Sequence, residues 1–321
     1  MEFADVFVCE KENKDFFSPF QISQSVIKPN FFIVGAPKCG TTAMNDYLSE
    51  HPDIFMARKE LHYFGCDLKT RLKLSEEEYL KYFNDAGEKK IIGEASVWYL
   101  FSKTAAEEIK KFSPQAKILI MLRNPVDVVY SLHSQHLYDG NEDIQDFETA
   151  LSFDEDRKRG IHLPDSVDYF ELPPYKDSVL FSNQVKRYLD VFGRENVHVV
   201  LHEDLTANAE NTFFKVLEFL GVSKRILINY GIINPGKQIK SFFLHRVIKK
   251  PSLRLKTVAR FLIPARAIRH FIMSFFFKWN IKQGKREDMS ERLKTSLKNF
   301  FEEDIRLLSK LIDRDLSAWL K

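Results

Sequence analysis

The segment that most constrains the fold of this chain is a strand, a loop and a helix that follow one another within residues 30–49. Residues 30–34 are mostly apolar and rich in Phe, Ile and Val, which predicts a buried strand. A loop with Gly35 and Gly40 follows, and we expect a helix over residues 41–49. The N-terminus of such a helix presents unpaired backbone N–H groups and the positive end of the helix dipole. The segment therefore predicts a binding site for an anion such as a phosphate group.

The position of a lysine separates this loop from the loops that bind Mg-ATP. Gly35 and Gly40 have the spacing of a P-loop, but Thr41 stands where an ATP-binding loop carries its lysine. The lysine of this chain is Lys38, inside the loop. This shift favours a phosphate ligand other than Mg-ATP.

Further apolar segments alternate with helical patterns along the chain. The segments that predict parallel strands are residues 31–34, 91–93, 117–122 and 197–201. Helical spacing of apolar residues is clear in residues 182–191 and 211–220. This alternation is typical of an α/β fold with a central parallel sheet and helices on both faces. We therefore expect a P-loop-like three-layer fold in one domain over residues 30–321, after a polar lead-in of residues 1–29.

A second candidate anion site follows the strand expected at residues 117–122. Arg123 stands at the C-terminal end of that strand, where open α/β sheets bind their ligands. Asn124 can cap the next helix, Pro125 suits its first turn, and Ser131 lies two turns further along. A guanidinium and a hydroxyl that converge suit a phosphate, whereas an ATPase usually ends this strand in an aspartate for magnesium.

Three motifs together resemble those of sulfotransferases that use PAPS (3′-phosphoadenosine 5′-phosphosulfate). Residues 37–42, Pro-Lys-Cys-Gly-Thr-Thr, resemble the loop that binds the 5′-phosphosulfate, and Arg123 with Ser131 resembles the 3′-phosphate motif. Residues 58–64, Arg-Lys-Glu-Leu-His-Tyr-Phe, resemble the Lys-Glu-x-His-Phe-Phe element of heparan-sulfate-type and bacterial members. The resemblance covers residues 30–222 well and the C-terminal third poorly. It implies a sulfotransferase with a five-stranded parallel sheet.

The resemblance also implies roles for the matched residues. Glu60 would accept the proton of an acceptor hydroxyl or amine, and Lys38 would stabilise the departing phosphate. His62 is a further catalytic candidate, although it could instead pack beside Glu60 and orient it. PAPS would be the sulfuryl donor, PAP its product, and no metal would be required. The residues that would bind PAPS are Lys38, Cys39, Gly40, Thr41, Thr42, Arg123 and Ser131.

One element departs from the family pattern. Residues 93–99, Gly-Glu-Ala-Ser-Val-Trp-Tyr, resemble a Glu-Lys-Ser/Thr-Pro element, but Ala95 replaces its lysine and Val97 its proline. The contact that this lysine makes elsewhere is either missing here or supplied from another position. Glu94 is expected to be either a substrate contact or a member of a structural ion pair.

The charge of the chain is distributed unevenly. The net charge is +3, yet residues 219–286 hold 16 of the 48 Lys and Arg residues and no Asp or Glu. Such a block predicts an anionic partner. We expect a small-molecule, glycan or glycolipid acceptor and no nucleic acid, and we consider a peripheral membrane contact through residues 219–286. The Phe-rich residues 271–277 are expected in the core or in the wall of an acceptor groove rather than in a membrane anchor.

The cysteines and the first residues bear on localisation. Three cysteines without a C-x-x-C pair suggest neither a disulfide framework nor a zinc site, and they favour a reducing compartment. Residues 1–17 contain no apolar run of the kind found in signal peptides. We therefore expect a cytoplasmic protein.

Two alternatives stay open from the sequence. The first is a P-loop small-molecule kinase, against which stand Thr41 in the lysine position and the lack of a magnesium aspartate after Leu122. The second is a non-enzymatic module that binds polyanions or membranes through residues 219–286. This module would leave the glycine loop and the pair Arg123–Ser131 unexplained.

Overall fold

The computed structural model describes residues 27–69, 71–163, 173–224, 237–249, 251, 253–263, 265–283 and 288–321. The predicted lead-in of residues 1–29 lies almost wholly outside the described residues.

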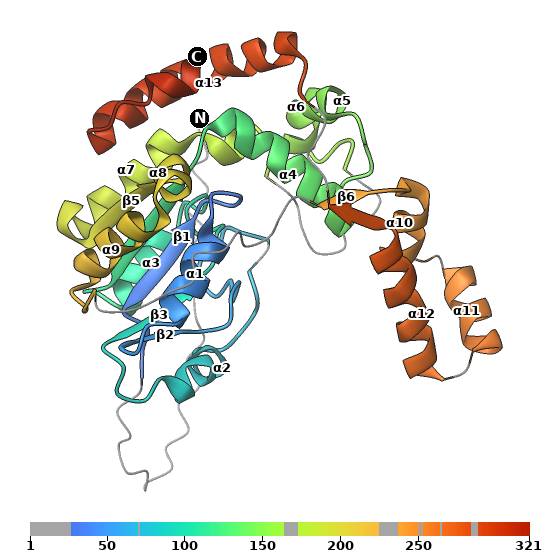
Figure 1. The fold of residues 1–321 in the computed structure, drawn as a ribbon, viewed down its shortest axis with the longest axis horizontal. Coiled ribbons are helices and arrows are strands. Elements are labelled where there is room, and N and C mark those ends of the chain that lie inside the picture. Colours follow the sequence, from blue (N-terminus) through green and yellow to red (C-terminus); the bar gives the residue numbers. More distant parts are fainter. Residues whose placement is uncertain are drawn as a thin grey trace, which may run out of the picture.

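A five-stranded parallel sheet forms the centre of the molecule (Figure 1), with the strand order β2–β3–β1–β4–β5. The four strands that the sequence predicts are confirmed, whereas β2 was missed because three residues are too few to show a pattern. The strands are β1 (Phe31–Gly35), β2 (Ile54–Met56), β3 (Ile91–Ala95), β4 (Lys117–Leu122) and β5 (Val197–Leu201).

Helices cover both faces of the sheet, which confirms the predicted three-layer α/β fold. Because crossovers between parallel strands are right-handed, the strand order places α1 (Thr41–Ser49) on one face and α3 (Ala105–Phe112) and α7 (Phe181–Phe192) on the other. On the first face, Tyr47 of α1 meets Phe213 of α9 (Ala209–Leu220), with their ring centroids 6.1 Å apart. The remaining helices of this body are α2 (Glu76–Leu80), α4 (Pro125–Asp139), α5 (Phe147–Ser152), α6 (Asp154–Lys158), α8 (His202–Ala207) and α13 (Glu291–Ile312).

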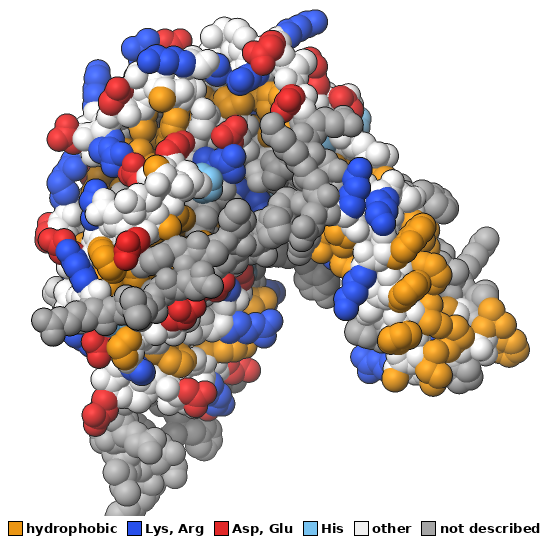
Figure 2. All heavy atoms as spheres, in the orientation of Figure 1, with side chains coloured by type: hydrophobic (Ala, Val, Ile, Leu, Met, Phe, Trp, Pro, Cys, Tyr) orange, Lys and Arg blue, Asp and Glu red, His pale blue; other side chains and the backbone are white. Residues whose placement is uncertain are grey.

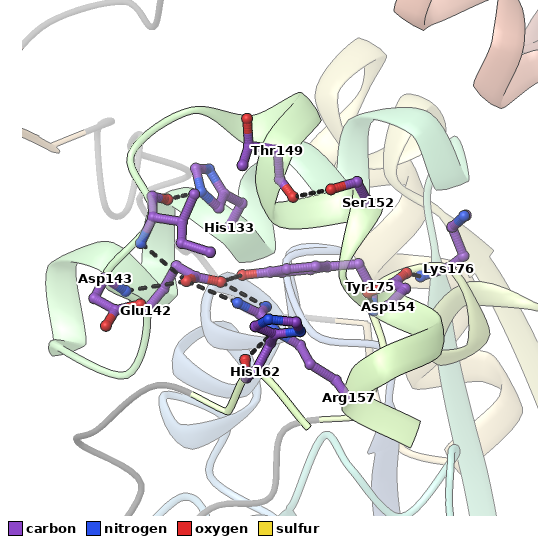
Figure 3. Close-up of polar contacts among 11 residues, drawn as sticks. His133, Glu142, Asp143, Thr149, Ser152, Asp154, Arg157, His162, Tyr175 and Lys176 are labelled. Carbon is purple, nitrogen blue, oxygen red and sulfur yellow. Dashed lines mark hydrogen bonds and ion pairs between the residues drawn. The ribbon is translucent and has the colours of Figure 1, made fainter. Parts of the chain in front are cut away.

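A buried ion pair fixes the loop that follows α4 (Figure 3). Arg157 of α6 donates to both carboxylate oxygens of Glu142 at 2.7 and 3.0 Å, and the Tyr175 hydroxyl donates to the same carboxylate at 2.8 Å. Burial alone would raise the pKa of Glu142, but the hydrogen bonds and the charge of Arg157 leave this pKa below its ordinary value. His133 of α4 lies in the same network, with its Nε2 2.8 Å from the carbonyl oxygen of Ile144. The network therefore holds the second half of α4 in place.

Residues 237–283, which belong to the basic block of residues 219–286, form an arm that projects from the body (Figure 1). The arm meets the end of α4 at Tyr138: His245 Nε2 lies 2.7 Å from the Tyr138 carbonyl oxygen, and the Phe277 and Tyr138 ring centroids are 5.7 Å apart. The expectation of a core position for residues 271–277 is wrong, because Phe271 is 71% and Phe275 58% exposed. The elements of the arm are β6 (Lys237–Ile239), α10 (Phe242–Lys249), α11 (Leu253–Leu262), α12 (Arg266–Trp279) and β7 (Ile281–Gln283).

Candidate active site

The loop between β1 and α1 lies beside the C-terminal end of β4. The Ala36 N–H donates to the carbonyl oxygen of Met121 at 2.6 Å, which holds the loop at this edge of the sheet. A Cβ atom on Gly35 would lie 2.6 Å from the Cβ atom of Leu100, so a larger residue does not fit there. Gly40 is the N-cap of α1 with a φ of 90°, and the first turn of α1 contains no acidic residue. No described side chain caps this turn and no acidic residue stands in it, so its N–H groups can receive an anion.

Two lysines meet at this helix terminus. Lys38 Nζ donates to Gln135 Oε1 of α4 at 3.0 Å, and Lys59 Nζ donates to the hydroxyls of Thr42 and Thr41 at 2.9 and 3.4 Å. Burial lowers the pKa of Lys59, although the neighbouring carboxylate of Glu60 opposes this shift. Positive charge beside the positive end of a helix is unfavourable by itself and becomes favourable when an anion binds there. The sequence analysis assigned no role to Lys59, although Lys59 matches the lysine of the Lys-Glu-x-His-Phe-Phe element.

Glu60 and His62 lie side by side next to this anion site. Glu60 Oε2 lies 3.2 Å from His62 Nε2 and accepts the Val97 N–H at 3.2 Å, while Glu60 Oε1 is 3.9 Å from Lys59 Nζ. Burial raises the pKa of Glu60, and Lys59 and the Val97 N–H partly offset this rise. Burial also lowers the pKa of His62 to about 4, so the imidazole is neutral at pH 7. The neutral imidazole therefore packs beside Glu60 Oε2 without adding a positive charge there.

The backbone is unusual at the same three positions. Five residues other than Gly have positive φ angles in the described part of the chain, and Lys38 (64°), Glu60 (62°) and His62 (44°) are three of them. Such conformations cost about 1–3 kcal/mol each and persist where the surrounding structure imposes them, most often at functional sites. The three residues that the sequence names as catalytic candidates are therefore held in defined orientations.

Arg123 and Ser131 occupy the predicted positions at the end of β4 and on α4. The side chain of Asn124 accepts the Val126 N–H at 3.0 Å, so the predicted cap of α4 is confirmed. Arg123 is partly exposed and forms an ion pair with Asp127 at 3.2 Å, an i,i+4 contact that a stronger anion can replace. Ser131 is buried.

The charge of Arg123 acts on the glycine loop. Burial raises the pKa of the Cys39 thiol, and Arg123 is the largest of the influences that oppose this rise. His202 of α8 is close as well, because a Cβ atom on Gly40 would lie 3.5 Å from His202 Cδ2, and burial and then Arg123 lower the pKa of His202. The glycine loop and α4, which carries Ser131, also meet where Lys38 Nζ contacts Gln135 of α4. The two predicted phosphate motifs thus lie at one edge of the sheet.

Glu94 has neither of the roles that the sequence suggested. Its side chain is fully buried, so it does not reach a substrate, and its Oε1 accepts hydrogen bonds from the hydroxyls of Tyr79 and Tyr99 at 3.0 and 2.9 Å rather than from a cation. Burial raises the pKa of Glu94 to about 8, despite the two tyrosine hydrogen bonds, so the carboxyl is mostly protonated at pH 7. The Tyr99 hydroxyl also accepts the Tyr63 N–H at 2.8 Å. Glu94 therefore supports the segment that carries Glu60.

Ala95 contributes through its backbone. Its carbonyl oxygen accepts the Glu60 N–H at 2.8 Å, and its side chain is fully buried. The cation next to Glu60 is Lys59, at 3.9 Å, which comes from the loop after β2 and not from β3.

Comparisons with known proteins agree with this geometry. The family model described as sulfotransferase domain matches residues 28–308. Carbohydrate sulfotransferase 15 of Mus musculus is 30% identical over 250 residues, with 60% of this chain and 44% of that protein covered. Heparan sulfate glucosamine 3-O-sulfotransferase 5 of Mus musculus is 26% identical over 198 residues, with 62% and 55% covered. The chain thus spans about half the length of these relatives.

A solved structure extends the similarity to the whole fold. The crystal structure of a sulfotransferase from Alicyclobacillus acidocaldarius superposes with a TM-score of 0.68 at 31% identity, and the match covers 92% of this chain and 100% of that chain. Together with the family model, this similarity shows that the chain belongs to the sulfotransferase domain family.

Proposed function

We propose that this chain transfers a sulfuryl group from PAPS to a hydroxyl or amine of an acceptor. The observation that carries the proposal is the placement of a carboxylate next to an anion site. Lys59 Nζ contacts the hydroxyl of Thr42 at the N-terminus of α1 and lies 3.9 Å from the carboxylate of Glu60. A base and a site for the departing phosphate are the two parts that this reaction needs.

The donor groups of the site suit the two phosphate-bearing ends of PAPS. Lys38, Lys59 and the first-turn N–H groups of α1 would hold the 5′-phosphosulfate. Arg123 would exchange Asp127 for the 3′-phosphate, with Ser131 as a further donor. Both sets consist of cations and N–H or O–H donors, which is the chemistry that phosphate oxygens require.

The residues then act on the acceptor in one step. PAPS supplies a sulfur bonded to a good leaving group. The acceptor oxygen or nitrogen forms a bond to this sulfur while the bond between sulfur and the phosphate oxygen breaks, and PAP leaves with the electron pair. Glu60 accepts the acceptor proton at Oε1, because Oε2 is occupied by His62 and the Val97 N–H. Lys38 and Lys59 stabilise the negative charge that grows on the phosphate.

We also propose a carbohydrate or glycolipid as the acceptor. The names of the two mouse relatives describe sulfotransferases of carbohydrates and of heparan sulfate. Residues 219–286, which carry 16 basic and no acidic residues, suit an acceptor that is itself anionic.

A transfer assay tests the proposal. The full chain is incubated with PAPS labelled on sulfur and a panel of desulfated heparan, chondroitin, glycolipid and small alcohol acceptors. We expect Glu60→Gln to lower turnover about a hundredfold or more, with the affinity for PAP unchanged, because a general base is lost. The matched control is Glu77→Gln, an exposed glutamate of α2. Near-normal turnover of the Glu60→Gln protein would assign the base to another group, and a lack of transfer to every acceptor together with a lack of PAP binding would contradict the function.

A further inference from the structure

The arm exposes large apolar side chains that no described residue covers. Six of them are more than half exposed, which is unusual for aromatic and aliphatic residues in one small region. They are Phe261 and Leu262 of α11 and Ile268, Phe271, Phe275 and Trp279 of α12. Figure 2 shows hydrophobic side chains gathered over the outer part of the arm.

The apolar residues of α12 form a continuous stripe. Ile268, Phe271, Phe275 and Trp279 follow one another at intervals of three or four residues, so they share one face of the helix. With a rise of 1.5 Å per residue, the stripe is about 16 Å long. Phe277 lies on the opposite side, where its ring packs against Tyr138 of the body. The stripe therefore faces away from the body.

Basic residues accompany the stripe. Arg260, Arg266, Lys278 and Lys282 are exposed, and Lys240 Nζ lies 5.3 Å from the ring centroid of Trp279. The sequence of the arm contains no acidic residue. Large apolar side chains on one face of a helix, with Lys and Arg around them, are typical of helices that lie in the interface of an anionic bilayer.

We propose that the arm, residues 237–283, docks this protein peripherally on an anionic lipid bilayer, with the stripe of α12 and the tip of α11 inserted among the lipids. The proposal goes beyond sulfuryl transfer and does not depend on it. The contact would be peripheral because, over the described ranges, no helix has both the length and the apolar character to cross a bilayer. The arm joins α4 at Tyr138, one turn after Gln135, the partner of Lys38, so the docking element and the candidate active site share one helix.

Two other occupants fit the arm less well. A second copy of the chain that paired arm to arm would bring two basic surfaces together without an acidic partner. An anionic glycan bound as the acceptor would engage basic residues of the block, but it would leave the aromatic stripe of α12 in water, so the stripe itself needs an apolar occupant. An anionic bilayer satisfies both.

Co-sedimentation of the full chain with vesicles, in the absence of PAPS, tests the proposal. We expect binding to vesicles of phosphatidylcholine with phosphatidylserine to be about tenfold or more stronger than to phosphatidylcholine alone, and to weaken as salt rises. The double variant Phe271→Ser, Phe275→Ser should lose this binding about tenfold or more. The matched control is Phe300→Ser, which alters a half-exposed aromatic residue of α13 in the body and should bind as the unaltered protein does.

Three results would overturn the proposal. The first is a lack of binding to phosphatidylserine vesicles by the unaltered protein. The second is equal binding by the double variant, with its fold verified by circular dichroism. The third is a dimer in sedimentation velocity that the double variant dissociates, because the stripe would then cover a second copy. Since vesicle binding is measured without donor or acceptor, its failure would leave the proposed sulfuryl transfer intact.

Discussion

Burial shifts the pKa of four groups at and around Glu60. It raises the pKa of Glu60 and of Glu94, and it lowers the pKa of Lys59 and of His62. Each of these shifts favours the neutral form of its group, because burial penalises the charged form. Sequence motifs identified Glu60 and His62, but they did not reveal the state of Glu94, because its surroundings come from Tyr79 and other distant residues.

The first prediction concerns Glu94 and the pH dependence of stability. Its pKa rises from an ordinary value of 4.5 to about 8 in the folded protein, chiefly because of burial. The folded state therefore keeps a proton that the unfolded state releases, and the stability that this gives is complete below about pH 4.5 and is lost as the pH rises toward 8. Ionisation of Glu94 lowers the unfolding free energy by at most about 1.4 kcal/mol per pH unit. The Glu94→Gln side chain stays neutral, so we expect the unfolding free energy of this variant to fall less steeply as the pH rises.

Denaturant unfolding at several pH values between about 5 and 8 measures this difference. The exposed Glu77→Gln variant is the control, since its side chain is mostly in water. If the unfolding free energies of the Glu94→Gln protein and the unaltered protein changed with pH in parallel, Glu94 would not hold a proton in the folded state.

At the scale of elements, the strands and helices that were predicted correctly are those with a local sequence signal at their ends. The strand β4 and the start of α4 were predicted to the residue, because the apolar run ends at Leu122 and Asn124 caps the helix. The strand β2 has no such signal, and its place in the sheet depends on pairing with β3. The buried pair of Glu142 and Arg157 was equally invisible, because two charged residues 15 apart look like surface residues in a sequence.

The second prediction concerns this ion pair. Arg157→Ala leaves the buried carboxylate of Glu142 without its cation, so we expect the unfolding free energy to fall by about 3–5 kcal/mol. The matched control is Arg306→Ala, which breaks an exposed i,i+4 pair with Glu302 and should cost less than about 1 kcal/mol. Denaturant unfolding at neutral pH compares the two. Similar losses of unfolding free energy in the Arg157→Ala and Arg306→Ala proteins would mean that the buried pair does not fix the loop after α4.

At the scale of the whole molecule, the chain divides into a body with the candidate active site and a basic arm. The motifs predicted the body, because the glycine loop, the element around Glu60 and the pair Arg123–Ser131 all lie within it. The charge of the arm was evident from the sequence, but its shape was not. Helical spacing in residues 271–277 is the same whether the apolar face packs on the body or faces outward, and only the position of α12 beyond Tyr138 distinguishes the two.

The central claim is that the glycine loop and Arg123 hold the two phosphate ends of PAPS, and calorimetry with PAP tests it most directly. We expect Arg123→Ala to weaken PAP binding by about 2–4 kcal/mol, because a charge-assisted contact to the 3′-phosphate is lost. Adenosine 5′-phosphosulfate has no 3′-phosphate, so its binding should change much less. Equal losses for both ligands, or tighter binding of ATP with magnesium than of PAP, would contradict the account.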